Sequence, residues 1–385
     1  MKKSYTLTLF LGLIFLALSG PVRGQEATRD SIRKQARQEV FNKIKENFKI
    51  GGFIDAQYRF DQEDEKRSSV MQIRRARLDL KGSLSTWVDF RLQADFAGTP
   101  KLLDAFVKVN FCKYVKLQIG QFKIPFSIEN PYSPLDLEFS DNAQVISALS
   151  GYKDISGVSS YVNSREIGAM LTGTLFEANM GEEKLPILQY SVGIFGGNGI
   201  NVKSDNMAKD LAARIDICPY IKHLTLSASG YWGKYDMPYE GKSVNTDGLR
   251  IRYTGGAEYK DDRLTIRGEY VWGRTDFAQE NQIDSVTTTY TPNPMNTHGF
   301  YVVAGYWFKF GWGKNSSIQQ KLRPVLRFDY YERDIAAGQT SLNYSAGIGW
   351  WPEKHVRIQI DYTLRQTLHK ATFGHMLTAI ASVKF

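Results

Sequence analysis

Long hydrophobic runs are scarce in this sequence of 385 residues. The only one covers 7–18; it follows Lys2 and Lys3 and precedes small residues that end at Gly24. About a dozen apolar residues are too few for a helix that spans a bilayer, whereas this arrangement is typical of a secretory signal peptide. We therefore predict a signal peptide over 1–24, with an uncleaved anchor as the alternative.

Cysteine and histidine are also scarce, with 2 and 5 residues. Cys112 and Cys218 cannot form a disulfide framework, so we expect two free thiols, with a single disulfide as the alternative. No two histidines are spaced as a metal-binding pair, and no motif supplies a nucleophile together with its base. The sequence therefore predicts no metal site, no cofactor and no catalytic residues.

The net charge of +9 overstates the basic character of the main part of the chain. Three of these charges belong to the signal segment and three to 25–49, which leaves about +3 for the rest. Lysines and arginines are spread over many segments rather than gathered in one patch, so a nucleic-acid partner is not expected.

From residue 49 onward, the hydrophobic period is two, which is the period of a β-strand. In the stretch RARLDLKGSL (75–84), charged or polar residues alternate with Ala, Leu and Gly. The pattern recurs about sixteen times, and most segments have the roughly 9–11 residues that a tilted strand needs to cross a membrane. The predicted strands are 49–60, 70–83, 87–97, 103–111, 115–124, 165–176, 186–196, 209–217, 223–233, 248–259, 263–274, 298–309, 320–332, 340–351, 355–365 and 375–385.

The connections between these strands alternate in length. Short turns such as 85–86 and 260–262 alternate with longer polar loops, which include 61–69, 127–164, 197–208, 234–247 and 275–297. A water-soluble β-sandwich has the same period, but its polar face carries fewer charges and its connections do not alternate in this way. Because no strand edge can stay unpaired in lipid, such strands must close. We predict an all-β fold: an antiparallel transmembrane β-barrel of about 16 strands over 49–385, with a wet, basic lumen.

Both ends of this barrel carry further signals. In 25–48, Ile32, Ala36, Val40, Ile44 and Phe48 recur every four residues, which predicts a short N-terminal amphipathic helix. We expect it at the mouth of the barrel; the alternative is a basic element that enters the pore or meets the membrane surface. The last strand ends on an aromatic residue, Phe385, and resembles the assembly signal of bacterial outer-membrane barrels.

Three stretches together resemble the phosphate-selective porin O and P family: IGGFIDAQY (50–58), IRRARLDLKG (73–82) and IGQFKIPFS (119–127). The resemblance covers 48–385. It implies a sixteen-stranded barrel in the bacterial outer membrane, in contact with lipid and the barrel-assembly machinery, and commonly a homotrimer. It also implies that the third loop folds inward and narrows the pore, and that small anions are the solutes.

Strand parity selects the side chains expected to line the lumen. Arginine dominates over lysine among them, and its planar fork suits phosphate or carboxylate oxygens. The candidate pore-lining and anion-binding residues are Arg75, Arg77, Lys81, Arg91, Lys108, Lys116, Arg214, Arg250, Arg252, Arg267, Arg323, Arg327, Arg357 and Arg365. The alternative is a structural mesh in which these groups pair with lumen acids, which are Asp79, Asp89, Asp95, Asp104, Glu166, Asp216, Glu258, Glu269, Asp329 and Asp361.

The segment 127–164 is the predicted constriction loop, with a surface loop as the alternative. Its candidate pore residues are Tyr132, Asp136, Glu138, Asp141 and Lys153. Acidic residues outnumber basic ones here, unlike the lysine-rich constriction expected of a strictly phosphate-selective pore. The sequence predicts a passive diffusion channel for small anions such as phosphate or polyphosphate. The alternative is a non-conducting surface or adhesion barrel with a plugged lumen.

Overall fold

The computed structural model describes residues 47–150, 154–156, 165–180, 183–203, 207–240, 242–282, 288–311, 319–368, 370 and 372–385. The predicted signal peptide, nearly all of the predicted N-terminal helix and Lys153 lie outside these ranges. The chain divides into two units, Met1–Phe48 and Lys49–Phe385. The second unit is a β-barrel, and it is described by itself below.

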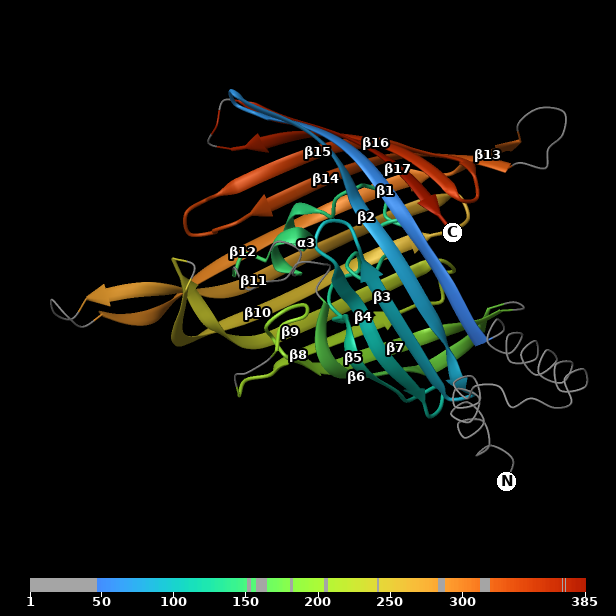
Figure 1. Cartoon of the computed structure of the whole chain (residues 1–385), viewed down its shortest axis with the longest axis horizontal. Coiled ribbons are helices and arrows are strands. Elements are labelled where there is room, and N and C mark those ends of the chain that lie inside the picture. Colours follow the sequence, from blue (N-terminus) through green and yellow to red (C-terminus); the bar gives the residue numbers. More distant parts are fainter. Residues whose placement is uncertain are drawn as a thin grey trace, which may run out of the picture. The chain divides into compact units, whose positions relative to one another are not determined.

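Every predicted strand is present as part of one antiparallel sheet (Figure 1). The elements are β1 (Phe48–Glu63), β2 (Lys66–Ser85), β3 (Val88–Asp95), β4 (Lys101–Asn110), β5 (Lys116–Lys123), α3 (Gln144–Leu149), β6 (Arg165–Met180), β7 (Glu183–Phe195), β8 (Asp210–Ile217), β9 (Leu224–Tyr239), β10 (Lys242–Lys260), β11 (Leu264–Gln282), β12 (Thr288–Tyr306), β13 (Phe308–Gly311), β14 (Gln319–Glu332), β15 (Thr340–Glu353), β16 (Val356–Thr367) and β17 (Phe373–Lys384). Since β12 and β13 both pair with β14, they form one wall strand interrupted at Trp307. The wall therefore has sixteen strands, and the predicted fold is confirmed.

The barrel closes between its first and last strands. β1 pairs with β17 from Phe53 opposite Lys384 to Gln62 opposite His375. Beyond this ladder, the backbone N–H groups of Gly52 and Phe385 each donate to the other's carbonyl oxygen at 3.0 Å. A closed ladder leaves no strand edge without hydrogen bonds, which lipid would penalise.

Three predicted loops are largely strand. β1 and β2 continue to a two-residue turn at Asp64 and Glu65, and Asp64 takes a positive φ of 53° there. The hairpins β9–β10 and β11–β12 also continue beyond the predicted strand ends. The pairing of β11 with β12 reaches Gln282 opposite Thr288. The β11–β12 hairpin extends well past its neighbours (Figure 1). The sequence did not predict these extensions because their residues are polar. Backbone pairing continues above the membrane, where a strand needs no apolar face.

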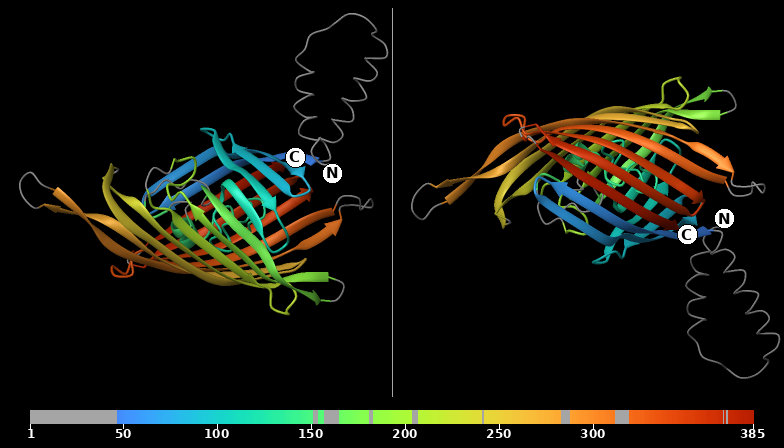
Figure 2. Two further views of the ribbon diagram at one scale, coloured as in Figure 1. Left: turned by 90° about the horizontal axis from the view of Figure 1, so that it is seen from below. Right: turned by 90° about the horizontal axis from the view of Figure 1, so that it is seen from above.

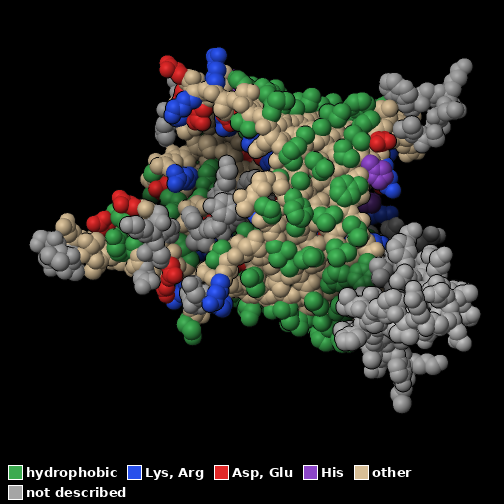
Figure 3. All heavy atoms as spheres, in the orientation of Figure 1, with side chains coloured by type: hydrophobic (Ala, Val, Ile, Leu, Met, Phe, Trp, Pro, Cys, Tyr) green, Lys and Arg blue, Asp and Glu red, His purple; other side chains and the backbone are tan. Residues whose placement is uncertain are grey.

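The outer surface of the wall is apolar, and Figure 3 shows hydrophobic side chains spread over it. On β2, Arg77 is 5% exposed whereas its neighbour Leu78 is 43% exposed. Ile119 on β5 and Leu326 on β14 are 54% and 64% exposed. This reverses the order in a water-soluble sheet and is the distribution of a barrel surrounded by lipid. Among the described residues, no helix is both long and apolar enough to cross a membrane. Both cysteines are free thiols.

Between β5 and β6, the described residues 124–150 and 154–156 pack inside the ring of strands, where Figure 2 shows α3 and its flanking segments. We call these described residues the inner loop. Its buried side chains Phe126, Phe139, Ile146 and Leu149 join a core cluster with wall residues that point inward, which are Tyr231, Val271, Tyr301, Val303 and Val325. Full burial of each such loop side chain contributes about 1.5–3 kcal/mol. The inner loop therefore fills part of the lumen, and this part of the wall faces the loop instead of water.

Candidate functional site

The inner loop is hydrogen-bonded to several strands of the barrel wall. The guanidinium group of Arg357 on β16 donates to the carbonyl oxygens of Leu135 at 2.8 Å and Leu137 at 3.1 Å. On the same strand, Asp361 accepts a hydrogen bond from the backbone N–H of Ser140 at 2.7 Å. The N–H of Gln144 donates to Asp329 on β14, and that of Ile128 donates to Glu269 on β11 at 3.0 Å. The loop is therefore anchored to wall strands at separate places along the chain.

The acidic side chains of the inner loop pair with wall arginines. Glu138 is buried between Arg267 and Arg323, and Asp154 pairs with Arg252. These pairs neutralise much of the acidic excess that the sequence predicted for this segment, leaving Asp136 as an exposed acid beside the wall.

Asp141 accepts hydrogen bonds from Arg59 and Arg74, two arginines that were not among the predicted lumen residues. Burial alone would favour its neutral form, but Arg74 and Arg59 outweigh this and hold the pKa of Asp141 well below its usual range. No arginine among the described residues lies within ion-pair distance of Glu129, and burial raises its pKa to about 7. The inner loop therefore contains one strongly ionised carboxyl group and one that titrates near neutrality.

Most of the candidate lumen arginines are paired with acids of the wall. On β2 and β3, Arg75 bonds Asp55 at 3.0 Å, Arg77 bonds Asp95 at 2.9 Å, and Arg91 lies between Asp79 and Asp104 at 2.8 and 3.1 Å. Elsewhere the pairs are Arg214 with Asp216, Arg250 with Asp210, Arg327 with Asp329 and Arg365 with Asp61. Arg357 instead bonds loop carbonyl groups and stacks over Trp351. Much of the arginine set thus forms the mesh that the sequence analysis kept as its alternative.

Three lysines differ from these arginines. Lys81 on β2 is exposed, and Lys108 on β4 and Lys116 on β5 are half-buried. No ion pair or side-chain hydrogen bond joins their amines to any residue in the described part of the chain. All three lie toward the end of the barrel where the strands are joined by the short turns 86–87 and 111–115. These amines are positive groups that a solute can approach.

Two cavities that share lining residues lie between the inner loop and the wall made by β1 to β5. Their volumes are about 250 and 260 Å³, and both are lined by Phe53, Arg77, Arg91, Gln93 and Ser133. We call the two together the passage. Its basic lining side chains outnumber its acidic ones: Lys49, Arg77, Lys81, Arg91, Lys123, Arg165 and Lys384 against Asp79, Asp104 and Asp136, with the C-terminal residue Phe385 at one end.

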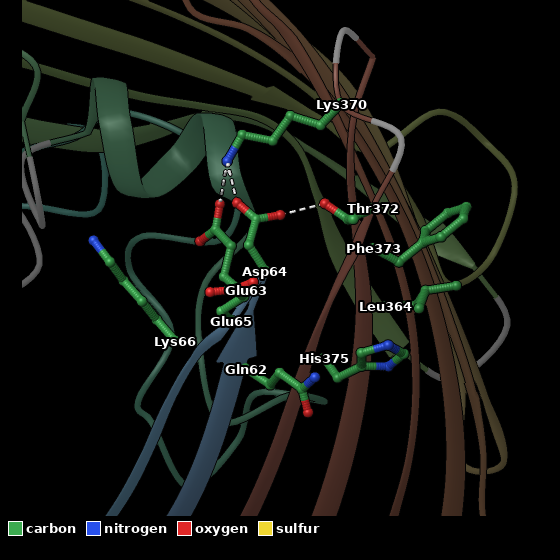
Figure 4. A pocket seen from close by; sticks show the side chains of 10 residues that line it. All are labelled: Gln62, Glu63, Asp64, Glu65, Lys66, Leu364, Lys370, Thr372, Phe373 and His375. Carbon is green, nitrogen blue, oxygen red and sulfur yellow. Dashed lines mark hydrogen bonds and ion pairs between the residues drawn. The ribbon is translucent and has the colours of Figure 1, made fainter.

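Two further cavities have a different character. One of about 290 Å³ lies beside Tyr132, whose hydroxyl donates to Glu258, and is also lined by Arg214 and Asp216. The other, about 1100 Å³, lies at the tips of β1, β2, β16 and β17 (Figure 4). There Lys370 bonds Glu63 at 3.1 Å and Asp64 at 3.3 Å, so carboxyl groups and lysines both line this rim. In the part of the chain that the structure describes, no cluster of His, Cys, Asp or Glu is arranged to hold a metal ion.

The sequence prediction missed four basic residues of the interior: Arg59, Arg74, Lys123 and Arg165. Arg59 has the inward parity of β1, so the same rule could have selected it, whereas Arg165 at the start of β6 has the outward parity and lies opposite Lys123 in the ladder. Lys123 has the outward parity of β5, but Gln121 and Phe122 are both buried because the chain leaves the wall there and enters the lumen. The apolar residues at inward positions, such as Val271 and Val303, were the available signal for where the loop packs.

The fold has known relatives. It superposes on an anion-selective porin from Comamonas acidovorans with a TM-score of 0.61 at 12% identity, covering 88% of this chain and 99% of that one. OprB from Pseudomonas putida superposes with a TM-score of 0.60 at 10% identity, covering 91% of this chain and 96% of that one. The trimer form of OmpT from Vibrio cholerae superposes with a TM-score of 0.55 at 11% identity, covering 88% of this chain and 99% of that one. At these identities the likeness concerns the fold alone.

Comparison with curated protein sequences finds no match. The model of the family described as phosphate-selective porin O and P matches residues 48–373, which is most of the chain and includes every strand except the last, of which it reaches only the first residue. This extent agrees with the sixteen-stranded wall, its apolar outer surface and its basic passage. The chain therefore belongs to the phosphate-selective porin O and P family and is a porin of the bacterial outer membrane.

Proposed function

We propose that this porin conducts small anions by passive diffusion through the passage. The supporting observation is the uneven use of charge in the lumen. Wall arginines on β10, β11 and β14 are neutralised by acids of the inner loop, whereas the wall of β2 to β5 keeps a basic excess beside open space. A passing anion exchanges part of its hydration shell for the side-chain N–H groups of this wall.

The roles of individual residues follow from their place along the passage. Arg77 touches both cavities, and Lys81 adds an amine at the turn side. Asp136 of the inner loop also lines the passage, and its negative charge repels anions. We assign Arg77 and Lys81 to anion attraction, and the paired arginines Arg267, Arg323 and Arg357 to holding the loop.

Conductance in planar bilayers tests this function. The purified porin should give steady single-channel currents and a reversal potential in a potassium chloride gradient that favours chloride. Replacing both residues in the double variant Arg77→Gln, Lys81→Gln should reduce this preference. Lys354→Gln, in the exposed turn between β15 and β16, is the matched control and should leave it unchanged. Absence of conductance, or a preference for cations, would refute the proposal.

Assembly and processing belong to the same proposal. We propose a homotrimer, as named for one form of the OmpT neighbour, with removal of 1–24 and a helical periplasmic segment over 25–48. Phe385 would act as the signal to the barrel-assembly machinery, and we attribute no catalytic activity to the chain. The mass of the detergent-solubilised protein and the N-terminal sequence of its mature form test the first two statements.

A further inference from the structure

The lining of the passage combines two kinds of side chain. Its apolar part consists of Phe53, Phe106 and Phe122 of the wall with Pro131 and Pro134 of the inner loop. The rings of Phe106 and Phe122 meet edge to face at 5.9 Å. Proline has no backbone N–H, so these loop positions present hydrocarbon rather than hydrogen-bond donors to a solute.

The basic side chains lie among these rings, since Arg91 is paired opposite Phe106 between β3 and β4, and most of their donors are already used. Arg91 directs all three of its guanidinium nitrogens to Asp79 and Asp104. Arg165 bonds Asp104 at 2.6 Å. The amine of Lys123 donates to the carbonyl oxygens of Asn130 at 2.8 Å and Tyr132 at 2.7 Å. These groups contribute positive charge to the passage but few free N–H bonds.

Arg77 is different. Its Nε donates to Asp95, and its guanidinium carbon lies 5.6 Å from the centre of the Phe53 ring. No hydrogen bond joins its two terminal nitrogens to any other residue that the structure describes. The passage therefore offers one guanidinium edge, next to an aromatic ring, within a field of positive charge.

One such edge suits one carboxylate, which accepts two parallel N–H bonds from an arginine. A phosphate dianion has more oxygens and holds its water more strongly, and five apolar rings replace none of that hydration. Resting on the proposed anion channel, we propose that the passage favours monocarboxylates with an aromatic or other apolar body over inorganic phosphate. The carboxylate bonds Arg77 while the body slides along Phe53, Phe106 and the two prolines.

Reversal potentials with sodium salts of benzoate, acetate and phosphate, at about pH 8 so that the carboxylic acids are ionised, test this inference. Benzoate should be several-fold more permeant than acetate, and both more permeant than phosphate. Phe106→Ser should abolish the advantage of benzoate over acetate. Phe111→Ser, an exposed aromatic residue of the turn after β4, is the matched control and should retain it.

Arg77→Lys supplies a second readout because it keeps the charge and removes the planar edge. It should retain anion preference over sodium but lose several-fold in carboxylate permeability relative to chloride. If wild-type permeability to phosphate equals or exceeds that to benzoate while the pore remains anion-selective, the inference is wrong and the anion channel stands. If the wild-type pore shows no anion preference, the proposed function itself is wrong.

Discussion

Neutralising Glu138 should release part of the inner loop. This carboxylate is 3% exposed and lies between Arg267 and Arg323, with the N–O separation to Arg323 at 3.5 Å. Glu138→Gln leaves Arg267 with Glu258 alone, at 2.9 Å, and leaves Arg323 without a carboxylate within ion-pair distance among the described residues. Breaking a buried ion pair on one side costs about 3–5 kcal/mol, because the remaining charge stays buried without compensation.

That cost should fall on the loop and not on the barrel, because the wall is closed by backbone pairing to which Glu138 contributes nothing. A change of about 1.4 kcal/mol alters an equilibrium tenfold, so states with the loop detached from β14 become populated. Loop contacts at Asp361 and Asp329 remain, so detachment is partial.

Single-channel recording measures the consequence. We expect larger or more variable conductance and a stronger anion preference, since Arg323 then lacks a carboxylate partner and Arg267 keeps only Glu258. Glu65→Gln, an exposed carboxyl group in the β1–β2 turn, is the control. Unchanged conductance and selectivity in Glu138→Gln, with normal barrel folding, would refute the idea that this ion pair holds the loop.

Three further predictions concern the wall and the loop. A Cβ at Gly52 would lie 2.6 Å from the aromatic ring of the C-terminal residue, so Gly52→Val should lower the yield of folded, heat-modifiable barrel on gels, whereas Gly255→Val, with open space at its Cβ, should fold normally. Leu326→Arg places a charge on the lipid face and should lower the free energy of unfolding in vesicles by about 2–4 kcal/mol if it lies at the bilayer midplane, whereas Ile335→Arg in the following loop should cost little. Because burial raises the pKa of Glu129 to about 7, above its unfolded value, its contribution to loop stability is complete at acidic pH and is lost as pH rises through 7. Current fluctuations should therefore increase as pH rises from 4.5 to about 7 in the wild type but show no such step in Glu129→Gln.

Local patterning carried much information about this protein. The alternation in 75–84 and its repetition sufficed to predict sixteen wall strands, their outward apolar faces and the inward direction of Arg75 and Arg77, because the two faces of a strand follow from chain geometry alone. Three short sequence motifs were enough to predict the family. Strand ends were less accurate above the membrane, since pairing there leaves no apolar signature.

Only the tertiary structure decided which of the inward charges face open space. Asp141 meets Arg59 and Arg74, and Glu138 meets Arg267, across separations of 67 to 129 residues, and no local pattern encodes such partners. The same folding of the inner loop covers Val271 and Val303 and leaves Arg77 beside an aromatic-lined passage. Strand parity is a property of neighbouring residues, whereas the neutralisation of a charge depends on which distant carboxylate the folded chain brings to it.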